Sequence, residues 1–241
     1  EGADEFFGGY NIYKEPFTVT WYDKIPLPIR RAIGAVADLL PPVHGINFLV
    51  RRGKPLAERY IGNTNLMDEH RKKKLLKNYH PGKLPTDLSR PYFELSKGQD
   101  AVTQMETCDL NLWMVGDILL KADKMSMAHS LELRVPYLDR EVFREAETYP
   151  VSYKLRGDTK AVLRTAANKT LPDAWANRTK KGFPVPIAKW LEDPEFSAKV
   201  RKSFAGDVAG EYFDQDKLLA MLDDPKHERR KIWTAYTFLT W

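Results

Sequence analysis

The sequence has very little cysteine, and its histidines are scattered. Cys108 is the single cysteine, so an internal disulfide is excluded and a reducing compartment such as the cytoplasm fits best. The five histidines lack the i,i+4 spacing that places two imidazoles on one helical face. We therefore expect no zinc site.

Long apolar runs and organised basic surfaces are absent as well. No stretch approaches the roughly 20 apolar residues that span a bilayer, and no signal-peptide pattern is visible. The net charge of +5 is spread over short clusters at 71–74, 178–181 and 226–231, as is typical of solvated surface. No aromatic and basic ladder marks a nucleic-acid groove. We expect neither a membrane nor a nucleic acid as partner.

The 241 residues, 43% of them hydrophobic, are enough to bury a sizeable core. Apolar periodicity and proline punctuation predict a mainly α-helical chain with few strands, with helices at 27–40, 100–115, 116–131, 160–167 and 228–241. Residues 133–138 indicate a short extended segment before an Asp139 helix cap. Met125, Met127 and Leu131 are interpreted as core.

The first ten residues, EGADEFFGGY, place two acidic side chains between glycines. Gly2 and Ala3 allow a ligand to approach the backbone, and Asp4 and Glu5 fall in the first turn of a predicted helix. Such a helix start offers N–H donors to an anion, beside a carboxylate that can hold magnesium. An ordinary acidic helix start with a Gly-Gly stop explains the same string, so the motif alone does not decide.

Several motifs in order resemble the synthetase domain of glutamine-hydrolysing asparagine synthetases. The longest covers residues 117–139, DILLKADKMSMAHSLELRVPYLD. The first ten residues resemble the second nucleotide-site turn of that domain, Lys160 with Leu163 and Arg164 resembles its Lys-x-x-Leu-Arg element, and residues 178–186 resemble its late Arg-x-Lys-x-Gly-Phe loop.

The resemblance implies that residues 1–241 are the C-terminal portion of this synthetase domain. The intact domain is then expected to have an α/β fold of the ATP-pyrophosphatase, adenine nucleotide alpha-hydrolase-like type, with its sheet upstream of this helical part. An N-terminal glutaminase domain and a Ser-Gly-Gly-x-Asp-Ser pyrophosphate loop have no counterpart in this sequence. We expect the chain to be inactive alone.

The family's reaction, as the resemblance implies it, joins aspartate and ATP into β-aspartyl-AMP with release of pyrophosphate, and ammonia derived from glutamine then displaces AMP. By motif match, Asp4 would hold magnesium, Lys160 would stabilise charge along the transfer path, and Gly2 would lie against ATP. Lys180 would face the pyrophosphate. Glu1 would be the base that accepts a proton from ammonia during amide formation.

Three other interpretations stay open at this stage. The scaffold could amidate another carboxylate, on a sugar or a peptide, or the chain could be a non-catalytic helical module. Lys160 and Arg164 could be an ordinary surface pair, and Asp123 and Arg134 are interpreted as scaffold. Apolar surface left by an absent sheet would favour self-association, so a homodimer is possible.

Overall fold

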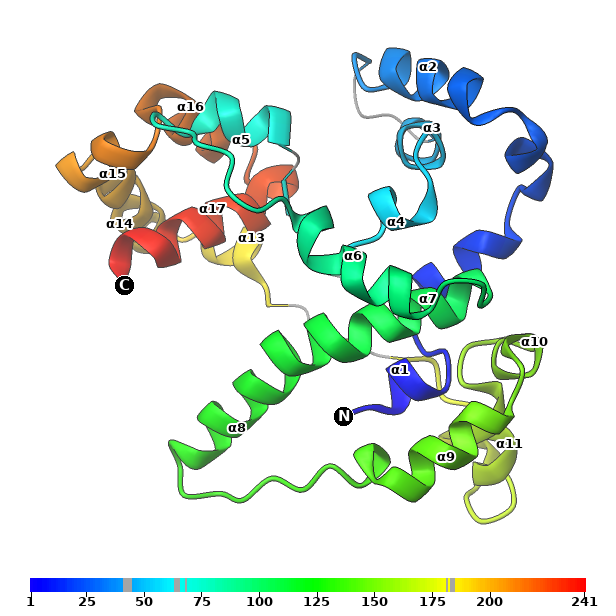
Figure 1. Cartoon of the computed structure of the whole chain (residues 1–241). Coiled ribbons are helices and arrows are strands. Elements are labelled where there is room, and N and C mark those ends of the chain that lie inside the picture. Colours follow the sequence, from blue (N-terminus) through cyan, green and yellow to red (C-terminus); the bar gives the residue numbers. More distant parts are fainter. Residues whose placement is uncertain (41–44, 63–65, 68, 181, 183–184) are drawn as a thin grey trace. The chain divides into compact units, whose positions relative to one another are not determined.

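A computed structural model of the chain describes residues 1–40, 45–62, 66–67, 69–180, 182 and 185–241. The chain divides into two compact units, of which the first combines Glu1–Thr64 with Lys83–Thr179 and the second combines Asn65–Gly82 with Lys180–Trp241. No strand occurs in the described residues, and an isolated bridge pairs Leu76 with Phe213. The prediction of a mainly helical chain is confirmed (Figure 1).

The first unit is built from short helices around one long rod (Figure 1). Its elements are α1 (Ala3–Phe6), η1 (Asn11–Phe17), η2 (Thr20–Lys24), α2 (Leu27–Ala37), α3 (Ile46–Arg52), α4 (Leu56–Arg59), α6 (Pro85–Leu95), α7 (Ala101–Cys108), η3 (Asp109–Leu119), α8 (Leu120–Met127), η4 (Pro136–Leu138), α9 (Arg140–Thr148), α10 (Val151–Lys154), α11 (Ala161–Ala167) and α12 (Asp173–Ala176).

The rod is a continuous run of α7, η3 and α8, although the sequence predicted a break at Gly116. Asp100 begins it by accepting hydrogen bonds from the Val102 and Thr103 backbone N–H groups. The hydrogen bonds of η3 follow π-helical spacing, and Gly116 lies inside this stretch. A glycine within a helix costs only about 1 kcal/mol, which good helix formers on both sides offset.

Two apolar clusters hold the first unit together. One gathers η1, α6, α7 and α10 around buried side chains such as Tyr13, Phe93 and Met105. The other packs Phe6 and Phe7 of the α1 region against Ala146 of α9, with Val162 and Leu163 of α11 partly buried beside them. Through this second cluster, the N-terminal turn lies against residues 138–163 of the same unit.

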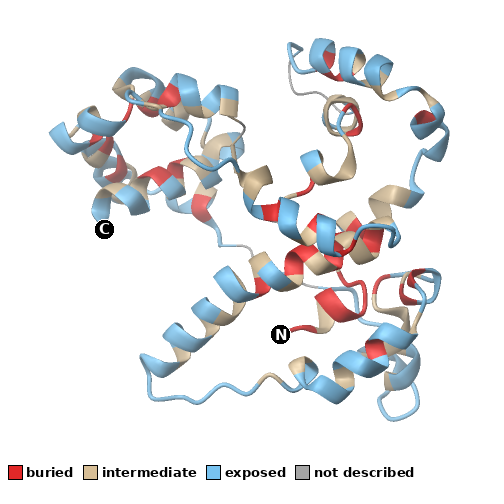
Figure 2. Cartoon of the chain, in the orientation of Figure 1, coloured by how far each residue is buried: buried red, intermediate tan, exposed pale blue. Residues whose placement is uncertain are grey.

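Not all sequence predictions hold in the rod and the segment after it. Asp139 caps α9 as predicted, accepting from Glu141 N–H at 2.8 Å. Met125, Met127 and Leu131 are more than half exposed, so their interpretation as core was wrong. The reason is that α8 runs beyond the helices that bury the start of the rod (Figure 2). Within the predicted extended segment 133–138, residues 133–135 lie in neither helix nor strand, whereas Pro136–Leu138 make a single 3-10 turn.

The second unit is a separate small helical body. It contains α5 (Glu69–Leu75), α13 (Ile187–Trp190), α14 (Pro194–Phe204), α15 (Asp207–Tyr212), α16 (Gln215–Ala220), η5 (Met221–Asp223) and α17 (Pro225–Thr240). Phe204, Leu218 and Ile232 form the centre of its core, and Tyr236 and Leu239 pack against it, as the predicted terminal helix requires. Proline at the start of α14 and α17 favours helix initiation there.

Candidate functional site

The first ten residues fold as a short helix followed by a tight turn. Asp4 and Glu5 lie in the first turn of α1, as predicted. Gly2 precedes the helix with φ of 92°, a conformation that L-residues rarely adopt. A side chain at Gly2 would also overlap the Leu138 side chain. Packing against η4 is therefore sufficient to explain this glycine, and its contact with ATP stays a prediction.

Asp4 and Lys160 meet in the structure, although they are far apart in the sequence. The Lys160 Nζ lies 3.1 Å from Asp4 Oδ1, and each side chain is 24% exposed. An ion pair largely shielded from water is screened less by salt than an exposed one. The two residues with the strongest predicted roles are thus brought to one place, partly open to solvent.

Lys160 is held there by an unusual backbone. Its φ of 57° and ψ of 34° place it in the left-handed region just before α11. For a residue with a side chain this conformation costs about 1 kcal/mol or more and is found mainly where the surroundings impose it. Thr159, directly before it, is buried. The site therefore carries local strain at the residue predicted to touch phosphate.

Arg164 fixes the backbone on both sides of α11. Its Nε donates to the Thr159 carbonyl at 3.0 Å, and its Nη1 donates to the carbonyls of Ala176 and Arg178 at 3.3 and 3.1 Å. Its Nη2 lies 3.6 Å from Asp158. The interpretation of Lys160 and Arg164 as an ordinary surface pair is wrong for Arg164, which binds three carbonyls on two backbone segments, one before and one after α11.

Gly9 closes the turn against the pair. Its N–H donates to the Asp4 carbonyl at 2.7 Å. A Cβ at this position would overlap the Asp4 Oδ1 and Lys160 Cε atoms and lie 2.7 Å from Asp4 Cα. Only glycine allows the backbone to pass this close to both side chains.

The remaining predicted residues are placed less closely. Glu1 is exposed at the start of the chain, one residue before the buried Gly2. Lys180 is exposed and belongs to the second unit, so its part in the site remains a prediction. Residues 181 and 183–184 of the predicted late loop lie outside the described residues.

A metal at Asp4 would need ligands beyond those of this turn. The described residues contain no group of three or more His, Cys, Asp or Glu side chains suited to a metal ion. Magnesium, however, commonly takes one or two protein carboxylates and completes its shell with phosphate oxygens and water. A single carboxylate beside a lysine fits such a phosphate-dependent site.

Comparison with known proteins decides the family. A sequence profile of the asparagine synthase family matches residues 1–241. The chain belongs to this family. It is 42% identical over 247 residues to the glutamine-hydrolyzing asparagine synthetase 1 of Bacillus subtilis, and 40% identical over 248 residues to a putative glutamine-hydrolyzing asparagine synthetase of Mycobacterium tuberculosis strain H37Rv.

The match covers all of this chain but only part of these asparagine synthetases. The chain spans 39% of the length of the Bacillus protein and 38% of the Mycobacterium protein.

No solved structure matches the chain significantly. In the described residues, no helix is long and apolar enough to cross a membrane. The family is established on the full length of this chain.

Sequence reasoning missed a hydrogen-bonded group next to the turn. The Tyr10 O–H donates to Glu5 Oε1 at 2.5 Å, and the Trp113 indole N–H donates to the Tyr10 oxygen at 3.3 Å. Glu5 is 2% exposed. Burial raises the pKa of Glu5, against the bond from Tyr10, and raises the pKa of Tyr10 as well. An acidic residue directly before two phenylalanines was the available signal.

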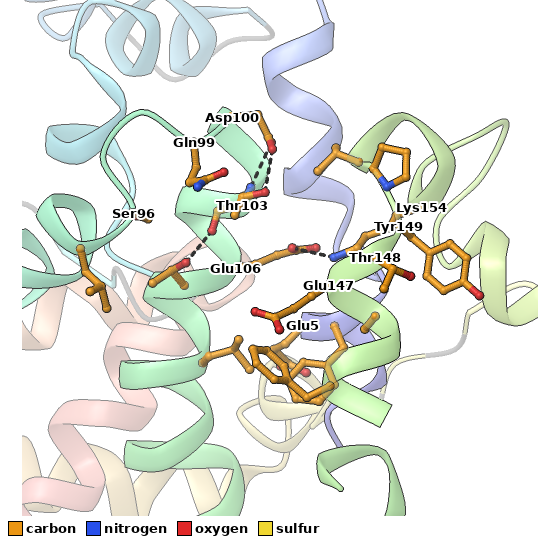
Figure 3. Close-up of a pocket in the computed structure, with 18 residues that line it drawn as sticks. Glu5, Ser96, Gln99, Asp100, Thr103, Glu106, Glu147, Thr148, Tyr149 and Lys154 are labelled. Atoms are coloured by element: carbon orange, nitrogen blue, oxygen red, sulfur yellow. Dashed lines mark hydrogen bonds and ion pairs between the residues drawn. The ribbon is translucent and has the colours of Figure 1, made fainter. Parts of the chain in front are cut away.

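A pocket of about 620 Å³ lies between the rod and α9 (Figure 3). Glu106 of α7 and Lys154 of α10 form a buried ion pair in it, with Oε2 and Nζ 3.1 Å apart, and Glu147 and Glu5 lie beside them. Burial raises the pKa of Glu106 to about 7, although Lys154 acts in the opposite direction. Helical periodicity could have found Glu106, because it lies next to Met105 on the buried face of α7.

Two tyrosines share a buried aspartate in the core of this unit. Tyr13 and Tyr60 both donate to Asp109 Oδ2, and Asp109 is fully buried. Burial raises the pKa of Asp109 to about 6 despite these two bonds. The neighbouring Cys108 is buried, and burial raises the pKa of its thiol to about 12. The hydrogen bonds from Tyr13 and Tyr60 to Asp109 hold η1 and the region around residue 60 against the rod.

Proposed function

We propose that this chain is the C-terminal part of the synthetase domain of a glutamine-hydrolysing asparagine synthetase. The overall reaction converts aspartate, ATP and glutamine-derived ammonia into asparagine, AMP and pyrophosphate. Membership of the asparagine synthase family and the names of the long relatives support this proposal. The contact between Asp4 and Lys160 is the observation that carries it.

In the first step, the side-chain carboxylate of aspartate attacks the α-phosphorus of ATP and pyrophosphate leaves, giving β-aspartyl-AMP. Negative charge builds on the leaving pyrophosphate, so a fixed cation lowers the barrier. Lys160 supplies this charge, because its Nζ is held at a partly exposed position by Asp4 and by the backbone before α11. By motif match, Lys180 is proposed to face the pyrophosphate.

Asp4 is the residue that would hold magnesium. When bound, magnesium would neutralise phosphate charge that the lysine alone cannot balance. The Asp4 carboxylate, which contacts Lys160, would also bind this ion. The backbone at Gly9 passes close to the Asp4 side chain and restricts its position. Gly2 would let the nucleotide lie against the start of α1. Other ligands would come from phosphate, water and upstream residues.

In the second step, ammonia attacks the acyl carbon of β-aspartyl-AMP and AMP leaves. The attacking nitrogen must lose a proton as the amide forms. Glu1 is the proposed base, and its exposed position leaves its carboxylate accessible to a substrate. The upstream glutaminase domain would release the ammonia, and the intact domain would have the α/β ATP-pyrophosphatase fold.

The experiment that tests the proposal is an assay of AMP and pyrophosphate. The full-length protein is supplied with ATP, magnesium, ammonia and either aspartate or another carboxylate, including sugar acids and peptides. We expect AMP and asparagine in equal amounts with aspartate. Turnover with another carboxylate and none with aspartate would assign the scaffold to a different amide. No turnover with any of them would favour a non-catalytic helical module.

A further inference from the structure

A directed chain of hydrogen bonds lies beside the Asp4 and Lys160 pair. An indole N–H can only donate, so the Tyr10 oxygen accepts from Trp113 and its own proton is left for Glu5. The bond to Glu5 is short, at 2.5 Å, as expected when a hydroxyl donates to a carboxylate. The order of the three groups is therefore fixed by their chemistry.

The bond between Tyr10 and Glu5 joins the two ends of the turn. Glu5 directly follows Asp4, and Tyr10 directly follows Gly9, whose N–H donates to the Asp4 carbonyl. The Tyr10 ring also packs edge to face with the buried Tyr13 ring, with centroids 5.5 Å apart. Trp113 belongs to η3, so the turn is tied to the long rod as well as to itself.

Because Glu5 is buried, its hydrogen bond with Tyr10 matters for the stability of the turn. The residue is 2% exposed, and a carboxyl taken out of water is costly without a donor. Phe6 and Phe7 already supply the apolar contacts that pack α1 against α9. The Glu5 carboxylate adds a directional contact, because it accepts a hydrogen bond from the Tyr10 hydroxyl in one geometry. This bond fixes the turn that carries Asp4 and Gly9.

We propose that Glu5 and Tyr10 are positioning residues that hold the Asp4 to Gly9 turn so that Asp4 and Lys160 meet at the ATP phosphates. This inference rests on the function proposed above. Neither residue needs to touch the substrate. Their effect passes through Asp4, whose carboxylate is 3.1 Å from the Lys160 amine, and through Gly9, where an added Cβ would overlap both of these side chains.

The test compares two tyrosines in the full-length protein. Tyr10→Phe removes the bond to Glu5, and the matched control Tyr13→Phe removes an equally short bond from a buried phenol to a buried carboxylate, Asp109. We expect Tyr10→Phe to lower kcat roughly 10- to 100-fold and to raise the KM for ATP several-fold, because small displacements of catalytic groups are costly. Tyr13→Phe should leave the KM for ATP within about twofold of wild type.

The KM for ATP separates positioning from loss of folded protein. A smaller folded fraction lowers the apparent kcat but does not raise KM. A second variant, Glu5→Leu, and the double variant Glu5→Leu/Tyr10→Phe test whether the two residues act as one. Since both single changes break the same bond, the double variant should lie within about twofold of the worse single variant. Independent, multiplicative losses would overturn the proposal.

Hydrogen exchange supplies a readout besides activity. In Tyr10→Phe, amides of residues 4–10 should exchange faster, whereas those of α17 in the second unit should not change. Wild-type kinetics and exchange in Tyr10→Phe, or an equal rise in KM in Tyr13→Phe, would overturn the positioning role. Lys160→Ala distinguishes a failure of the proposed function from a failure of the positioning role. A wild-type rate in this variant would remove both. An inactive Lys160→Ala beside a normal Tyr10→Phe removes only the positioning role.

Discussion

Gly9 is the residue with the tightest steric requirement in the site. A methyl group there would overlap Asp4 and Lys160 at once. We predict that Gly9→Ala separates the pair, lowers the free energy of unfolding by about 1–3 kcal/mol and abolishes most of the AMP formation. Thermal unfolding and the AMP assay of the full-length protein measure the two effects.

Gly116 provides the matched control. A Cβ added there meets no atom within 4 Å, and the residue lies inside the helical rod. Gly116→Ala should therefore stabilise the protein by about 0.5–1 kcal/mol and leave AMP formation unchanged. An equally active Gly9→Ala would show that the close passage of the turn has no bearing on function.

Asp109 and Glu106 make the first unit less stable as the pH rises. Burial raises their pKa values to about 6 and about 7, from ordinary values of 3.8 and 4.5. Between about pH 4 and about pH 7, the folded chain then holds more protons than the unfolded chain, so the free energy of unfolding falls with increasing pH.

Asp109→Asn tests this pH dependence. The amide oxygen can still accept from Tyr13 and Tyr60, but position 109 no longer titrates. We predict that the loss of stability between about pH 5 and about pH 7 is smaller in the variant by about 1 kcal/mol. Urea unfolding at both pH values measures it, and an unchanged difference would contradict burial as the cause.

At the scale of elements, α11 depends on one arginine. Arg164 donates to the carbonyls of Thr159, Ala176 and Arg178, and lysine cannot reproduce this planar fork. We predict that Arg164→Lys lowers the free energy of unfolding by about 1–3 kcal/mol and loosens the chain between α12 and residue 179. Calorimetry and limited proteolysis measure these changes.

The control for Arg164→Lys is Arg144→Lys. Arg144 is exposed and pairs with Glu141 within α9. The control should change stability by less than about 0.5 kcal/mol. If both variants melted alike, the carbonyl contacts of Arg164 would contribute nothing measurable to the element.

The sequence predicts the helices better than their ends and exposure. Apolar spacing and proline positions located α2, α11 and α17, because these signals are local. The unbroken rod was missed because one glycine does not outweigh its helix-forming neighbours. The exposed Met125 and Leu131 were missed because burial depends on what packs against a face, which periodicity does not contain.

The candidate site was predictable for a different reason. Motif order paired Asp4 with Lys160, and their contact is confirmed, whereas their roles stay predictions. The Glu5, Tyr10 and Trp113 chain and the buried Glu106 and Lys154 pair were not foreseen. A local pattern can indicate that Glu5 and Glu106 are buried, but only the folded chain brings Trp113 to Tyr10 and Lys154 to Glu106.

At the scale of the whole molecule, several large apolar side chains are exposed on α8 and on the segment after it. Leu120, Met125, Leu131 and Leu133 are all exposed along α8 and the segment after it. We predict that this 241-residue chain self-associates through these side chains in a concentration-dependent way, since exposed apolar side chains that gather on one surface mark interaction sites. Met125→Lys/Leu131→Lys should reduce it in sedimentation velocity. The control Leu39→Lys, at an exposed residue elsewhere, should not reduce self-association. Equal sedimentation of all variants would show that the α8 surface does not mediate self-association.

The most direct test of the account is the aspartate-dependent release of pyrophosphate by the full-length Lys160→Ala variant. The matched control is Lys199→Ala, whose exposed lysine pairs with Glu195 in the second unit. If Lys160 stabilises charge on the leaving pyrophosphate, its loss should slow the reaction by about 100-fold or more while the control keeps the wild-type rate. A wild-type rate in Lys160→Ala would contradict the account.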